Sequence, residues 1–175
     1  MEARARKADR NRRQRRIIRH LADFPRQYAA LEHAMLAFGE SFDLHEFKKA
    51  FNTNEDIDAY NRVQALERAL GRVQNFIADL AQDGVKLAQL PSAPDQHISP
   101  TNKAFAALHQ AGVISGQLRK RLMRAQEARS VIEHGYIETS ASQVHAAAVL
   151  IHSCARDFIV PYRGWIETYL DDLDG

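Results

Sequence analysis

The chain has 175 residues, 45% of them hydrophobic, and a formal net charge of +2 at pH 7. This composition suffices for one domain with a buried core. It contains eight glycines, five prolines and no alternating apolar and polar run of strand length, so the sequence predicts an all-α fold. The single cysteine, Cys154, has no disulfide partner, and no apolar run is typical of a signal peptide or membrane span. We therefore expect a soluble cytoplasmic protein without membrane contact.

Positive charge is concentrated at the start of the chain. Residues 1–19 hold nine Lys/Arg and two acidic residues, whereas the rest holds 15 basic and 20 acidic residues. We treat residues 1–22 as a basic arm or helix extension and residues 23–172 as the helical domain. The arm is either a solvated segment or a contact for RNA phosphates, for which the candidates are Arg12, Arg13, Arg15 and Arg16.

The first half of the chain predicts three helices. An apolar stripe in steps of three and four crosses Pro25, which indicates a bent helix or two stacked pieces over residues 12–40. Asp43 and Glu46 resemble a capping box that opens a short helix burying Leu44 and two phenylalanines. A long helix then follows the Thr53–Asp56 segment and ends near Gly84. Its predicted buried positions are Tyr60, Val63, Leu66, Leu70, Val73, Ile77 and Leu80.

The second half predicts a loop and three further helices. The loop is the proline-rich segment 89–99, after which Ser99 and Pro100 begin a short helix that stops at Gly112. Ser115 caps the next helix. Ser140 and Gln143 form a capping box for a long closing helix, in which a kink is expected at Pro161.

The stretch 127–136 is the most informative part of the sequence. Leu118, Leu122, Ala125 and Ile132 form one apolar stripe of a helix, and Arg129 falls on the same stripe. Burying a guanidinium costs several kcal/mol unless an anion or a strong acceptor meets it. The position of Arg129 on an apolar stripe therefore needs a functional or structural explanation.

Three residues of this stretch together suit metal-independent cleavage of RNA. Arg129 can bind a phosphate, His134 titrates near neutrality and can act as acid or base, and Tyr136 offers a hydroxyl or a stacking ring. No metal-ligand spacing, glycine-rich phosphate loop or dinucleotide motif occurs, so we expect no metal and no cofactor. His145 and His152, seven residues apart, are interpreted as helix-surface or interface residues.

Helix geometry separates two of these residues. His134, five residues after Arg129, projects roughly 140° from it around a straight helix. Either Gly135 loosens the last turn, or two copies of the helix meet at a two-fold axis and bring both types of side chain into one cleft; we favour the second. The structural alternatives are an Arg129–Glu133 pair, a histidine favoured by the helix end, and a core tyrosine at position 136.

The spacing of Arg129, His134 and Tyr136 resembles the Arg-x4-His-x-Tyr motif of the HEPN superfamily, specifically of HepT-like toxins. The resemblance includes the segments 67–80 and 105–118 and covers roughly residues 25 to 170. Ser130 stands where that family often has asparagine.

The resemblance implies an up-and-down bundle of about five main helices that dimerises through the motif helix. It also implies a metal-independent endoribonuclease toxin, paired with a minimal nucleotidyltransferase antitoxin that in some systems adenylylates the tyrosine, here Tyr136. Arg129 and His134 would be catalytic, with Ser130, Glu133 and Tyr136 supporting them. Two alternatives remain open: a non-catalytic HEPN module that binds a nucleotidyltransferase and presents its substrate, and a helical dimer that only binds nucleic acid through its arm.

Overall fold

The protein is all-helical throughout the part that the structure describes. The structure is a computed structural model describing residues 2–53, 55–91, 98–134 and 140–174, with side chains for 7–53, 55–91, 98–128 and 140–171. No strand occurs in these ranges, which confirms the expected fold class. The helices are α1 (Glu2–Leu36), α2 (Leu44–Phe51), α3 (Ile57–Leu87), α4 (Pro100–Gln110), α5 (Gly116–His134) and α6 (Ala141–Asp174).

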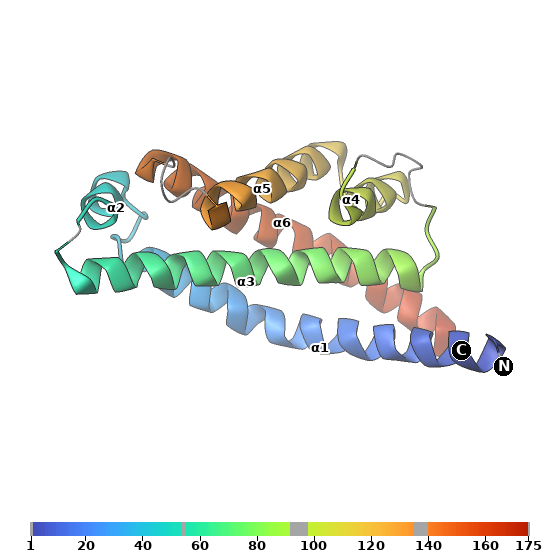
Figure 1. The fold of residues 1–175 in the computed structure, drawn as a ribbon. Helices are drawn as coiled ribbons and strands as arrows, with labels where there is room; N and C mark the ends of the chain where they lie inside the picture. The colour runs from blue at the N-terminus through green and yellow to red at the C-terminus, as the bar shows by residue number, and fades with distance from the viewer. Residues whose placement is uncertain (1, 54, 92–97, 135–139, 175) are drawn as a thin grey trace.

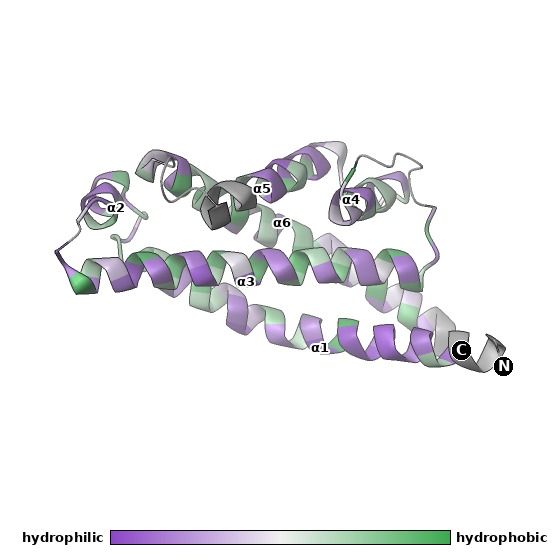
Figure 2. Ribbon diagram, viewed as in Figure 1, coloured by the Kyte–Doolittle hydropathy of each residue, from purple (hydrophilic) through white to green (hydrophobic). Residues whose placement is uncertain are grey.

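The three long helices, α1, α3 and α6, pack against one another; α3 and α6 run in the same direction, and α1 runs opposite to both (Figure 1). The short helices α2 and α4 lie over the two ends of α3, and α5 lies over its middle, antiparallel to it (Figure 1). Hydrophobic residues recur along faces of each helix (Figure 2) and form one core cluster. None of the described helices has the length and apolarity needed to cross a bilayer.

The basic N-terminal segment belongs to the same helix as the residues that follow it. α1 runs without a break through Pro25, and Ile17 and Leu21 are buried in the common core. Proline has no N–H to donate to the carbonyl four residues earlier. That carbonyl, of Leu21, instead accepts a hydrogen bond from Arg163 Nη2 of α6 at 3.0 Å. Of the two expected arrangements, a bent helix and two stacked pieces, the second does not occur, because α1 is one helix.

Most local capping signals were predicted correctly, but Thr53 does not cap α3 and instead donates from its hydroxyl to the Lys49 carbonyl. Asp43 and Asp56 each accept two backbone N–H bonds at the starts of α2 and α3. Ser99 caps α4, and Ser115 accepts from the Leu118 N–H at the start of α5. At the start of α6 the capping box is complete, because Ser140 N–H donates to Gln143 Oε1 and Gln143 N–H donates to Ser140 Oγ.

Three predictions about packing were wrong. α3 does not end at Gly84 but continues to Leu87, and Gly84 is buried where a side chain of α6 crosses the helix. Leu44 and Tyr60 are 36% and 57% exposed. Both lie in the first turn of a helix at the end of the bundle, where fewer helices remain to cover them (Figure 1).

Candidate active site at the end of α5

Four of the predicted site residues lie in the last turns of α5. The structure describes the helical backbone of Arg129, Ser130, Glu133 and His134 but not their side chains, and Tyr136 lies outside the described residues. Because residues 129–134 are helical, positions 129 and 134 are about 140° apart around the axis. A single copy of α5 therefore does not bring them to one face.

The stripe that precedes Arg129 faces the core of its own chain. Leu118, Leu122 and Ala125 are 7%, 2% and 4% exposed and belong to the common core cluster. These three residues are therefore not a free seam for a second copy. A contact between two α5 helices would have to use the turns beyond Ala125 or the opposite face.

Two side-chain contacts fix α5 just before the motif. Gln74 of α3, which is 2% exposed, donates from Nε2 to the Ala125 carbonyl at 2.7 Å. Arg121 donates to Asp157 at 2.7 Å and to Ser153 Oγ at 2.9 Å, both on α6. The Arg121 guanidinium also lowers the pKa of the Asp157 carboxyl. Since the Ala125 carbonyl lies one turn before Arg129, the position of Arg129 is set by α3 and α6.

Glu67 is a candidate site residue that the sequence analysis did not select. Val63, Glu67, Leu70, Gln74 and Ile77 alternate steps of four and three, so Glu67 shares the face of α3 on which Gln74 contacts α5. Because α5 is antiparallel to α3, Glu67 lies toward the end of α5 that carries the motif (Figure 1). Burial raises its pKa to about 7. A carboxyl group that titrates near neutrality can take or give a proton.

Glu67 could have been found by the criterion that selected Arg129, because both are charged residues on an apolar stripe of a helix. It was overlooked because the stripe of α3 was followed through Leu66 and Val73, which lie beside Glu67 and Gln74. All of these positions face neighbouring helices, so α3 is buried over more than one stripe.

Glu67 should make the stability of the protein depend on pH. In the folded protein its carboxyl keeps a proton up to about pH 7, whereas the unfolded chain releases it near pH 4.5. The free energy of unfolding should therefore fall as pH rises from about 4.5 to 7 and level off above. In Glu67→Gln this contribution, about 1–2 kcal/mol after allowance for solvent screening, should be absent. Urea unfolding at pH 5 and pH 8 measures the difference; identical pH dependence in both proteins would contradict it.

The four arginine candidates of the N-terminal segment divide into two kinds. Arg13 donates to Asp9 at 2.9 Å and to the buried Asp83 at 3.3 Å, and Arg16 also donates to Asp83. Arg12 and Arg15 are exposed. Asp83 lies 16 residues after Glu67 on α3, which is about 24 Å along a helix. The structure therefore does not bring these arginines together with the end of α5.

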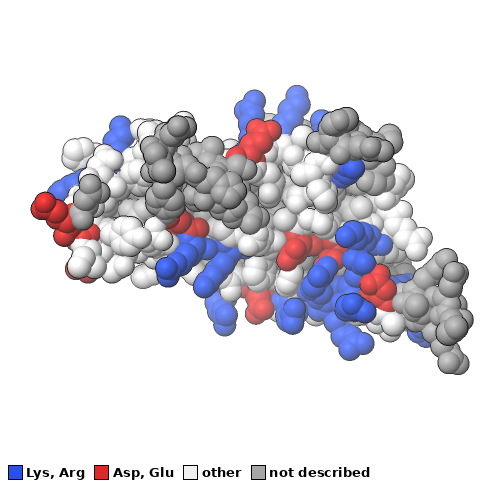
Figure 3. Space-filling model, in the orientation of Figure 1, with Lys and Arg blue, Asp and Glu red and all other residues white. Residues whose placement is uncertain are grey.

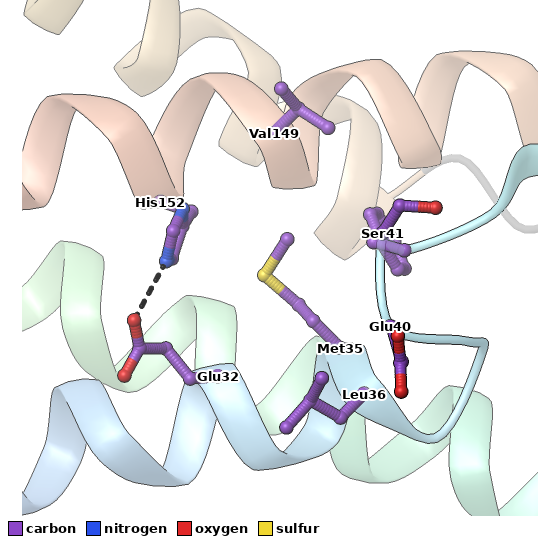
Figure 4. A pocket seen from close by; sticks show the side chains of 8 residues that line it. Glu32, Met35, Leu36, Glu40, Ser41, Val149 and His152 are labelled. Atoms are coloured by element: carbon purple, nitrogen blue, oxygen red, sulfur yellow. Dashed lines mark hydrogen bonds and ion pairs between the residues drawn. The ribbon is translucent and has the colours of Figure 1, made fainter.

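The two histidines of α6 contact α1 and the loop that follows it. His145 stacks on Phe42 and its Nε2 lies 2.7 Å from the Phe42 carbonyl oxygen. His152 stacks on Tyr28, bonds its hydroxyl at 2.8 Å and lies 3.4 Å from Glu32 (Figure 4). His152 also borders an open hollow of about 530 Å³ between α1 and α6. Among the described residues no group of three His, Cys, Asp or Glu side chains could hold a metal ion.

Comparison with known proteins supports the fold alone. No protein-family model and no curated protein matches the sequence. Among solved structures, the chain is similar to YutE, a cytosolic protein of unknown function from Bacillus subtilis, with a TM-score of 0.61 and 15% sequence identity. The similarity covers 90% of this chain and 92% of YutE. Most of the helical bundle thus has a counterpart in a solved structure.

Proposed function

We propose that the protein is a HEPN-type endoribonuclease that cleaves RNA without a metal ion and acts as the toxin of a toxin–antitoxin pair. The observation that carries the proposal is the Arg-x4-His spacing at the end of a helix whose preceding turn is fixed by Gln74. In chain order α1, α3, α5 and α6 alternate in direction (Figure 1), and this up-and-down arrangement is the one that the family resemblance leads us to expect. The carboxyl group of Glu67 on the facing side of α3 adds a further group that can carry a proton near neutral pH.

The proposed reaction is transfer of the phosphoryl group within the RNA strand. The 2′-hydroxyl loses its proton and attacks the adjacent phosphorus, the bond to the 5′-oxygen breaks, and that oxygen takes up a proton. A 2′,3′-cyclic phosphate and a 5′-hydroxyl result. Arg129 would stabilise the charge on the phosphoryl oxygens, and His134 would transfer protons. A homodimer would supply a second histidine, so that one could act as base and the other as acid.

The proposed partners follow from the same resemblance. A cognate minimal nucleotidyltransferase would act as antitoxin, and AMP on Tyr136 would place a bulky charged group beside the proposed catalytic residues. We propose a cytoplasmic location, in keeping with RNA as the substrate. A non-catalytic HEPN module that presents substrate to such a nucleotidyltransferase is the second candidate.

Incubation of the purified protein with end-labelled RNA in excess EDTA tests the proposal. We expect cleavage that EDTA does not reduce, fragments ending in a cyclic phosphate, and a dimer by light scattering. Intact RNA after long incubation with folded protein would overturn the ribonuclease assignment. Stable binding of a nucleotidyltransferase by that inactive protein would then support the second candidate.

A further inference from the structure

A shallow hollow on the N-terminal half of α1 is lined almost wholly by arginines. Its lining residues are Ala8 and four arginines, Arg12, Arg15, Arg16 and Arg19, which we call the basic stripe; its volume is about 600 Å³. Lys and Arg side chains gather over this part of the molecule in Figure 3. The four positions recur at the spacing of one helix face and extend over about 10 Å.

The stripe retains positive charge because few acids face it. Asp83 is 1% exposed and pairs with Arg13 and Arg16, and Asp9 pairs with Arg13. Asp79 adds a weaker attraction at Arg16. Among the described side chains, no acid forms an ion pair with Arg12, Arg15 or Arg19. Three guanidinium groups side by side without counter-charges constitute a site for an anionic partner.

The helix that carries the stripe is packed in place before any partner arrives. Ile17, next to Arg16, is fully buried, and Asp83 holds the Arg16 guanidinium from the α3 side. A preformed site loses less conformational entropy on binding than a disordered basic arm would. The N-terminal segment therefore differs from a solvated tail in that its charges are carried along one face of a packed helix.

We propose that the basic stripe binds the phosphates of an RNA strand without reading its sequence. The 10 Å length corresponds to about three nucleotides of a stacked strand. Guanidinium groups form paired hydrogen bonds with phosphate oxygens. No aromatic side chain lines the hollow, so the structure offers these nucleotides no base-stacking surface. The choice of RNA among polyanions rests on the proposed function.

The stripe also indicates the direction of the RNA relative to the proposed active site. Asp83, beneath the stripe, is about 24 Å along α3 from Glu67, which faces the end of α5. A strand held at both places would span about seven nucleotides. We therefore expect RNA shorter than this to be bound more weakly and cleaved less efficiently than longer RNA.

Salt-dependent binding tests the proposal on an Arg129→Ala background, which keeps the RNA probe intact. The probe is a fluorescent oligouridylate of about 12 nucleotides. Three phosphate contacts, at Arg12, Arg15 and Arg19, give a slope of about −2.1 in a plot of log affinity against log salt, so affinity at the stripe should fall about 18-fold between 50 and 200 mM salt. Replacing Arg12, Arg15 and Arg19 together by glutamine should make the measured slope shallower by about 2.

A charge-matched variant controls for net charge. Arg26→Gln, Lys48→Gln and Lys49→Gln together remove the same three charges, all exposed and all outside the hollow. We expect this control to keep a slope within about 0.5 of the parent. Equal slopes for the two triple variants, with melting curves showing both folded, would overturn the proposal. Polyglutamate that displaces the labelled RNA as effectively as unlabelled RNA does would also overturn the proposal, in favour of an acidic protein surface as partner.

The outcome is separable from that of the cleavage assay. If the wild-type chain leaves RNA intact but loses RNA binding in the stripe variant, the stripe stands and the ribonuclease assignment fails. If the wild-type chain cleaves RNA, and the stripe variant binds and cleaves it with unchanged salt dependence, the ribonuclease assignment stands and the stripe proposal fails.

Discussion

Arg129→Ala should reduce RNA cleavage by about a hundredfold to a thousandfold, and His134→Ala by about a hundredfold to ten-thousandfold. Removal of one group that stabilises charge in the transition state costs a factor of about 10² to 10³, and loss of a general acid or base costs a factor of about 10² to 10⁴. Single-turnover cleavage with excess enzyme measures the chemical step directly. In cells, both variants should lose growth inhibition.

Arg124→Ala is the matched control for Arg129→Ala. Arg124 is an exposed arginine of α5, five residues before Arg129, and it is not part of the motif. We expect its cleavage rate to remain within about threefold of the wild type, since a surface charge has a small effect on a chemical step. Full activity in a folded Arg129→Ala, His134→Ala double variant would exclude the proposed site. Full activity of Arg129→Ala alone would assign the phosphate contact to another residue.

The fold could be predicted from the sequence where local chemistry decides it. Asp43, Ser99 and Ser140 sit at helix starts because their side chains bond to backbone N–H groups within a few residues, and this is visible in the sequence. The buried stripe of α6 was likewise predicted from its spacing, through Val144, Ile151 and Phe158 to Tyr162. Such features need no knowledge of what lies opposite.

Contacts between distant segments could not be predicted in this way. The hydrogen bond that compensates for Pro25 joins Arg163 to the Leu21 carbonyl, 142 residues away in the sequence. The residues next to either partner contain no pattern that predicts it. Glu67 and Gln74 are recognised as neighbours of the motif helix only when the packing of α5 against α3 is known. The site prediction from the sequence therefore stayed on one helix, whereas the structure adds the neighbouring face of α3.

Gly84→Ala should strongly destabilise the protein, although alanine is the better helix former. A Cβ atom at Gly84 would lie 2.5 Å from Tyr162 Oη and 3.0 Å from an atom of the Trp165 ring. Tyr162 is fully buried and donates a hydrogen bond to the Leu80 carbonyl, so it cannot move aside cheaply. Overpacking costs about 1–3 kcal/mol, and the lost hydrogen bond about 1 kcal/mol more. Allowing about 1 kcal/mol for helix propensity, we expect a net loss of about 2 kcal/mol in urea unfolding.

Gly71→Ala separates packing from propensity on the same helix. Among the described residues, no atom beyond the neighbouring turns of α3 itself lies within 4 Å of a Cβ at Gly71, so the substitution should raise the free energy of unfolding by about 0.5–1 kcal/mol. Tyr162→Phe removes the hydroxyl that Gly84→Ala would meet, so the two changes combined should cost less than the sum of their separate effects. Additive costs would show that Gly84 is not required by Tyr162. Stabilisation by Gly84→Ala similar to that by Gly71→Ala would contradict the close approach of α6 to α3.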